Sequence, residues 1–113
     1  MIGGFIIAND SIAARILVRA LGPTLAEGGI TTPLADTTLE LRNSNGELVR
    51  RNDDWKSTQQ AEIEATKMPP RSDLEAALIA TLRPGAYTAI LAGKNASTGV
   101  GLLEVYNLNT RRR

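Results

Sequence analysis

The sequence predicts an all-β fold: an antiparallel β-sandwich, jelly-roll or immunoglobulin-like, of about seven to eight strands with one short helix or helical turn. Short runs of β-branched and aliphatic residues recur along the chain, and clusters of Gly, Pro, Asn and Asp separate them. Only one stretch has a helical composition. The 113 residues, 42% of them hydrophobic, suffice for one domain with its own core.

The first two runs predict strands. Residues 2–8 (IGGFIIA) are apolar and end at a polar NDS cluster. Residues 14–21 (ARILVRAL) alternate, so one face of that strand is wholly apolar and the other is mixed. The apolar face consists of Ile16, Val18 and Ala20. Residues 22–36, with two prolines and three glycines, predict a loop that crosses between sheets.

A β-hairpin is predicted next. Residues 37–42 (TTLELR) alternate between apolar and polar side chains, and NSNG follows them. Asn45-Gly46 favours the positive φ angles that a primed turn needs. We therefore expect residues 47–51 (ELVRR) to pair antiparallel with residues 37–42.

The second half of the chain predicts one helix and three strands. Residues 57–67 have a helical composition, with Ser57 or Thr58 as the cap and Ile63 as the apolar anchor. Residues 74–82 (LEAALIATL) fit a helix by propensity and a strand by alternation, and the RPG turn after them favours the strand. The last two strands are expected at residues 86–93 and 100–108.

Composition and charge narrow the function classes. Residues 1–108 are predicted to form the one domain, and residues 109–113 a basic tail. Thirteen Lys and Arg face twelve Asp and Glu, which is too balanced for a typical nucleic-acid binder. The chain has no histidine and no cysteine, so the usual general base and thiolate metal sites are missing, and we do not expect an enzyme. No apolar run is long enough for a membrane-spanning helix.

Several stretches resemble a known family. LRPGAYTAIL (82–91) and TTLELRNSNGELVRRNDDW (37–55) resemble the C-terminal pre-peptidase domains, whose hairpin has the form LELYDSNGxLIAxNDDW. With GGFII and ILVRALGPTLAEGGI added, nearly the whole chain looks like an uncharacterised β-sandwich module of exported bacterial proteins. Members usually carry another stretch before IGGFII, which leaves open whether a first strand is supplied from elsewhere.

The resemblance implies a non-catalytic structural or assembly module of a bacterial surface or secreted protein. An unpaired strand edge in such a module invites strand addition from a neighbour. We therefore expect a homo-oligomer, a polymer such as a filament, or contacts with neighbouring domains of a longer chain. The alternative is a calcium-dependent module that binds carbohydrate or protein.

The segment RNDDW (51–55) holds the densest cluster of polar side chains. Calcium binds six to eight oxygen ligands, and carboxylates and amides supply them. The candidate ligands are Asn52, Asp53, Asp54 and Asp73. Asp36 or Glu104 would complete such a site if the fold brings either one against it. The competing interpretation is that these residues end a strand by hydrogen bonding to the local backbone.

Four residues are predicted to have structural roles. Trp55 is expected to cover an edge of the core, and Asn45 with Gly46 to make the hairpin turn. Tyr87 follows a Pro-Gly turn and resembles a tyrosine corner, in which the hydroxyl bonds to upstream backbone. Aromatic residues make up 4% of the chain, which is a small supply for an open sugar-stacking surface.

Overall fold

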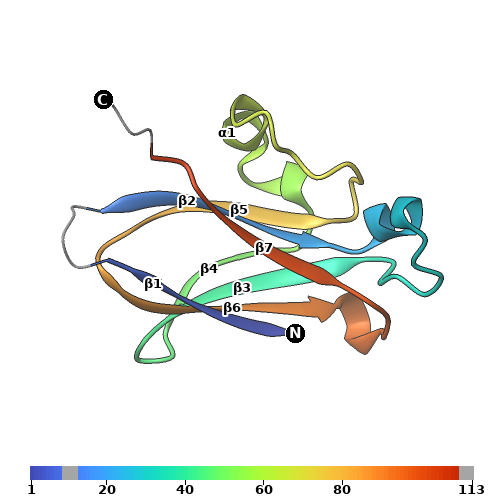
Figure 1. Ribbon diagram of the computed structural model, residues 1–113, viewed down its shortest axis with the longest axis horizontal. Helices are drawn as coiled ribbons and strands as arrows, with labels where there is room; N and C mark the ends of the chain where they lie inside the picture. Colours follow the sequence, from blue (N-terminus) through green and yellow to red (C-terminus); the bar gives the residue numbers. More distant parts are fainter. Residues whose placement is uncertain (9–12, 110–113) are drawn as a thin grey trace.

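The structure is a computed structural model, and it describes residues 1–8 and 13–109 (Figure 1). This part of the chain forms seven strands: β1 (Ile2–Ile7), β2 (Ala14–Leu21), β3 (Thr37–Asn43), β4 (Leu48–Asn52), β5 (Ala76–Leu82), β6 (Gly85–Gly93) and β7 (Leu102–Asn107). One short helix, α1 (Gln60–Ala65), and three 3₁₀ turns, η1 (Pro23–Gly28), η2 (Trp55–Ser57) and η3 (Lys94–Ala96), lie between them. Beyond Asn109, the predicted basic tail lies outside the described residues.

The strands form two antiparallel sheets that face each other, which confirms the predicted β-sandwich. One sheet has the order β1-β6-β3-β4 and the other has the order β5-β2-β7. Strands β3 and β4 form the predicted hairpin and pair directly. Every other connection between consecutive strands crosses from one sheet to the other, which is why most pairings join residues far apart in the chain.

The core between the sheets follows the alternation of the sequence. Ile16, Val18 and Ala20 of β2 are buried there, as are Leu39 and Leu41 of β3. Strand β5 contributes Ala76, Leu78, Ala80 and Leu82 to the same cluster. The alternation of residues 74–82 therefore predicts the buried face of β5 correctly, and the strand interpretation of this segment is confirmed.

A second, smaller core covers the outer face of the β5-β2-β7 sheet. It consists of Leu17, Trp55, Ile63, Ala77 and Ile79. The segment with η2 and α1 lies over this face, so β2 is buried on both sides (Figure 1). Leu17, which the alternation places on the mixed face of β2, is fully buried for this reason.

The helix is shorter than predicted, and its cap differs. Helix α1 spans six residues, and its N-cap is Gln59 rather than Ser57 or Thr58. The Ser57 hydroxyl donates to the backbone carbonyl of Asp54 instead, at 2.6 Å. The hydroxyl of Thr58 accepts a hydrogen bond from the Asn52 amide. Both side chains thus bond to the end of the hairpin, so neither can cap the helix.

The hairpin turn also differs in detail from the expectation. Gly46 has a positive φ of 80°, whereas Asn45 is not among the described residues with positive φ. Asn43 closes the loop, since its carbonyl accepts from Gly46 N and its N–H donates to the Glu47 carbonyl, both at 3.0 Å. This is a three-residue loop with glycine in the left-handed position, a common alternative to the two-residue primed turn.

One sheet has four strands and the other has three, so β1 has no strand of its own opposite it across the core. Strand β4 packs against β5, β3 against β2 and β5, and β6 against β7. Strand β1 is the outer strand of the four-stranded sheet, next to β6 (Figure 1). Leu103 of β7 reaches its inner face at Gly3, and Phe5 is only partly buried there.

Candidate functional site

Three carboxylates meet where the β3–β4 hairpin closes on itself. Asp36 immediately precedes β3, and Asp53 and Asp54 immediately follow β4. Because the two strands are antiparallel and Leu39 pairs with Asn52, the end of β4 returns to the start of β3. One oxygen from each of the three carboxylates lies within 4.8 Å of the others.

The three carboxylates are poorly compensated by their surroundings. Oδ1 of Asp36, of Asp53 and of Asp54 is buried from solvent and has no hydrogen-bond partner among the described residues. Among residues 1–8 and 13–109, the cation that pairs with the cluster is Lys94, whose Nζ lies 2.9 Å from Asp53 Oδ2. Three negative charges therefore face one positive charge.

The pKa values of Asp36 and Lys94 are shifted by this excess of negative charge. Burial raises the pKa of the Asp36 carboxyl, and the negative charges of Asp54 and Asp53 raise it further, whereas Lys94 lowers it. The pKa of the exposed Lys94 ammonium is also raised, first by its hydrogen bond to Asp53 and then by the charge of that residue. The positive charge of Lys94 thus does not offset the effect of burial and of the two neighbouring carboxylates on Asp36.

The geometry suits an oxygen-binding cation. Two oxygens that bind one ion at about 2.4 Å can be at most twice that distance apart, and the cluster meets this condition. Three carboxylates supply three of the six to eight oxygens that Ca²⁺ takes, so water or backbone carbonyls would supply the rest. Mg²⁺ would keep more of its water at the same site.

Two of the predicted ligands have other partners. Asn52 is buried and bonds through both ends of its amide: Oδ1 accepts from Ala77 N at 3.1 Å, and Nδ2 donates to the Asp54 carbonyl and to Thr58. The side chain of Asp73 is 72% exposed and pairs with Lys56 at 3.0 Å. Asp36, which was only a conditional candidate, joins Asp53 and Asp54 instead. Glu104 pairs with Arg19 on the outer face of β7 and β2.

The residues with predicted structural roles are placed as follows. Trp55 is buried in the second core, beside Ile63 and Leu17. The hydroxyl of Tyr87 donates to the Arg83 carbonyl at 2.8 Å, four residues upstream. Phe5 stacks against the ring of Tyr87, and Tyr106 lies beneath the guanidinium of Arg19. All four aromatic side chains are buried or partly buried.

Sequence reasoning missed one carboxylate altogether. Glu75 is 0% exposed, yet its oxygens accept hydrogen bonds from Gly22 N, Thr24 N, the Thr24 hydroxyl and Ser72 N. It therefore joins the loop after β2 to the start of β5. In the sequence Glu75 looks like one polar residue of an alternating strand, and nothing there indicates that it points inward.

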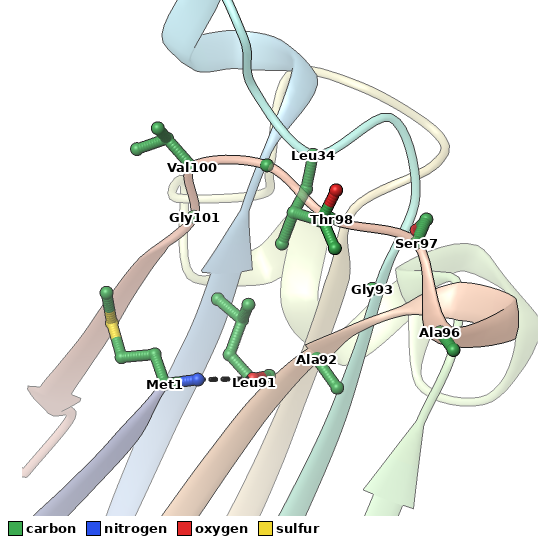
Figure 2. Close-up of a pocket in the computed structure, with 11 residues that line it drawn as sticks. Met1, Leu34, Leu91, Ala92, Gly93, Ala96, Ser97, Thr98, Val100 and Gly101 are labelled. Atoms are coloured by element: carbon green, nitrogen blue, oxygen red, sulfur yellow. Dashed lines mark hydrogen bonds between the residues drawn. The ribbon is translucent and has the colours of Figure 1, made fainter.

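An apolar cleft of about 490 Å³ opens at one end of the sandwich, beside β1. Figure 2 shows the side chains of Leu34 and Leu91 pointing toward each other, with Met1 and the segment of Val100 and Gly101 to one side of them. The lining offers few polar groups and no charged side chain. Ligand sites usually combine an apolar lining with several convergent polar groups, so we interpret this cleft as the gap at the uncovered end of the core.

The free edge of β1 is the remaining candidate. Met1 and Leu91 exchange two backbone hydrogen bonds, so they form a hydrogen-bonded pair of the antiparallel ladder. Pairing then alternates, and the N–H and C=O groups of Ile2, Gly4 and Ile6 point away from β6 toward the open edge. Ile2 is 70% exposed and Ile6 is 78% exposed on the same side of the strand.

No family model, no curated protein and no solved structure matches this chain in the comparisons. Among the described residues, no helix is long and apolar enough to cross a membrane.

Proposed function

We propose that this chain is a non-catalytic structural module that assembles with other chains by strand addition at the open edge of β1. The observation that carries the proposal is the open edge: within the described part of the chain, the backbone groups of Ile2, Gly4 and Ile6 that point away from β6 pair with no other strand, and the two isoleucine side chains are exposed. Exposed, flat, apolar edges are sites where another strand can pair.

Two other outer strands are protected in ways that β1 is not. Strand β4 carries the exposed charges Arg50 and Arg51 and lies beside a register shift in β3. Strand β5 is covered by polar side chains from the segment before α1. Charge, irregularity and cover are the usual means by which proteins keep strand edges from pairing. Strand β1 (IGGFII) contains no charged residue and no proline.

The placement of the module on a bacterial surface or in a secreted protein rests on the resemblance of LRPGAYTAIL and the NDDW hairpin to pre-peptidase C-terminal domains. The absence of histidine and cysteine from the chain supports a non-catalytic role. A structural module of this kind contributes through its edges and faces rather than through a pocket.

The test is the mass of the protein in solution as a function of concentration, by analytical ultracentrifugation. We expect the wild-type chain to associate and Ile6→Lys to remain monomeric, because a charge on an edge strand opposes pairing and burial of an isoleucine contributes about 1.5–3 kcal/mol. Val49→Lys is the matched control, since it makes the same kind of change on the protected strand β4. A wild-type chain that stays monomeric at millimolar concentration would refute the proposal.

A second function, the binding of a divalent cation, is favoured by a separate observation. Asp36, Asp53 and Asp54 each bring one carboxylate oxygen within 4.8 Å of the others, and Oδ1 of each is buried without a partner among the described residues. A cation there would join the two ends of the β3–β4 hairpin and relieve the repulsion. The carbohydrate-binding alternative has less support, because none of the four aromatic side chains is exposed as a stacking platform.

Calcium should therefore raise the melting temperature of the folded protein relative to a chelator. Ligand at a hundred times its Kd stabilises a protein by about 2.7 kcal/mol. Asp54→Asn should abolish most of the increase, whereas Asp73→Asn should retain it, because Asp73 lies apart from the cluster. Equal melting temperatures of the wild type in calcium and in chelator would exclude the cation function.

A further inference from the structure

The residues that face the open edge of β1 form a self-complementary set. Ile2, Gly4 and Ile6 alternate along the strand, with Gly4 at the centre and an isoleucine on either side. Each has both its N–H and its C=O directed away from β6. This follows because Met1 and Leu91 exchange two backbone hydrogen bonds, and hydrogen-bonded pairs alternate along an antiparallel ladder. A strand with this pattern matches an antiparallel copy of itself.

We infer that the partner at this edge is a second copy of the chain, paired antiparallel through β1 about a two-fold axis at Gly4. The inference rests on the proposed function, and it specifies the partner and the register. In this register Ile2 lies opposite Ile6 of the second copy, and Gly4 lies opposite Gly4 of the second copy. Every residue with free edge groups then has a partner, and three residue pairs exchange about six hydrogen bonds.

Registers shifted from this one pair fewer of the free edge groups. A slip by one residue would set outward-pointing groups against residues whose groups already bond to β6, and it would reverse the faces of the side chains. A slip by two residues keeps the faces, but it leaves one of the three edge residues in each copy without a partner. The centred register is therefore the one that uses the whole edge.

The side chains fit the same arrangement. In each copy Ile2 pairs with Ile90 of β6, and Ile6 pairs with Ala86. The dimer would extend these pairs into continuous apolar rows across four strands, from Ile90 through Ile2 to Ile6 and Ala86 of the second copy. Strands β1 and β6 contain no charged side chain, so no charge is buried or opposed when the rows meet.

The contact is small. A strand of six residues is about 20 Å long, and one such strip buries well under the roughly 800 Å² per partner of a standard interface. We therefore expect a weak dimer that forms at micromolar to millimolar concentration. Because the two-fold contact uses the same edge on both copies, assembly through it stops at the dimer.

The absence of cysteine allows a clean test of this register in the full chain. In Gly4→Cys the two introduced thiols would face each other across the axis, at a Cα separation of about 5.5 Å that permits a disulfide. An added side chain fits there, since a Cβ at Gly4 would meet only the Tyr87 carbonyl at 3.8 Å. Thr88→Cys is the control. Thr88 lies on β6, where it pairs with Gly4 of β1. In the dimer the two Thr88 residues would therefore be separated by three strand spacings, about 14 Å.

Under a mild oxidant at a concentration where the wild type associates, Gly4→Cys should form a disulfide-linked dimer at least tenfold faster than Thr88→Cys. Equal rates for the two variants, with the wild type still associating, would overturn the two-fold register and leave the proposed function standing. Faster cross-linking of Gly4→Cys to Val105→Cys than to itself would overturn it in favour of head-to-tail pairing of β1 with β7. A wild type that never associates would overturn both.

Discussion

Strands β5 and β1 are both outer strands, but their edges are treated in opposite ways. On β5, the Ala77 N–H donates to Asn52 Oδ1 at 3.1 Å, and Ile79 exchanges two hydrogen bonds with the amide of Gln59, at 2.9 and 3.0 Å. The two amide side chains thus imitate a neighbouring strand. On β1, the corresponding groups of Ile2, Gly4 and Ile6 point to the outer edge, where no other strand of the described residues pairs with them.

The difference shows that side chains of the described residues cover the edge of β5 by hydrogen bonding, whereas no such contact is found at the edge of β1. The covering residues belong to a segment that also buries Trp55 and Ile63 against the sheet, so cover and second core form together. Strand β1 carries no charged residue and has no such cover from the described part of the chain, and it is the outer strand of the wider sheet. This contrast between the edges makes β1 the expected site of assembly.

The largest expected effect comes from removing the side chain that covers the buried end of the β5 edge, which would make this edge more like that of β1. Asn52→Ala leaves the buried Ala77 N–H without an acceptor and removes the bonds to Asp54 and Thr58. An unsatisfied buried group costs about 1–3 kcal/mol, and the small cavity adds to this. We expect a loss of about 3 kcal/mol in the free energy of unfolding, measured by urea denaturation.

Asn52→Asp is the matched variant, because it keeps an acceptor for Ala77 N but loses the donor. It should also lose stability, because a buried carboxylate oxygen would then face the Asp54 carbonyl oxygen in place of the amide donor. If both variants unfold at the wild-type urea concentration, the Asn52 amide does not cover the edge in solution.

A smaller change at the same edge tests the link to assembly. Gln59→Ala removes both hydrogen bonds to Ile79 and should cost about 1–2 kcal/mol, whereas the neighbouring Gln60→Ala should stay within about 0.5 kcal/mol of the wild type. Gln59→Ala should also open a second edge. We therefore expect the double variant Gln59→Ala/Ile6→Lys to associate in ultracentrifugation, although Ile6→Lys alone does not. A monomeric double variant would show that uncovering β5 is not sufficient for pairing.

Much of the fold could be predicted because its signals are local. The alternation in residues 14–21, 37–42 and 74–82 reports directly which side chains face the core, and the structure places them there. The cover over the outer face of β2 could not be predicted in this way. It depends on where the segment with Trp55 and Ile63 docks, and docking is a long-range property that no short pattern encodes.

The candidate sites depend on the same long-range information. Asp53 and Asp54 stand out in the sequence, but Asp36 joins them only because the hairpin returns β4 to the start of β3. Asp73 is closer in character to a ligand than Asn52 is, yet it pairs with Lys56 in solvent. The bare edge of β1 becomes visible only once the order of strands in each sheet is known.

The contrast between paired and unpaired polar groups extends from strand edges to carboxylates. Glu75, at the start of β5, is fully buried and accepts hydrogen bonds from four donors. Asp36, near the start of β3, is less buried, yet its Oδ1 has no partner among the described residues. The more buried carboxylate is thus the one with more donors, so the supply of donors, and not exposure to solvent, separates the two sites. A carboxylate with a full set of donors is structural, and one without them is available to a cation.

The smallest expected effect concerns Asp36 in the absence of divalent cations. Because the pKa of Asp36 is raised in the folded protein, the folded state holds this proton more tightly than the unfolded chain does. Stability is therefore lost as pH rises from about 3.9, the ordinary aspartate value, through the folded pKa, and the loss is complete above it. Asp36→Asn removes the loss.

The variant should melt higher than the wild type at pH 7 in a chelator. The advantage should shrink as pH falls through the raised pKa of Asp36 toward the ordinary aspartate value, because Asp36 of the wild type then takes up a proton itself. It should reverse at pH 7 in calcium if the cation binds. Asp73→Asn, which leaves the cluster intact, should show no such pH-dependent gain. A lower melting temperature of Asp36→Asn in chelator at neutral pH would mean that Asp36 has a stabilising partner in solution, and the cluster would then resemble Glu75 rather than contrast with it.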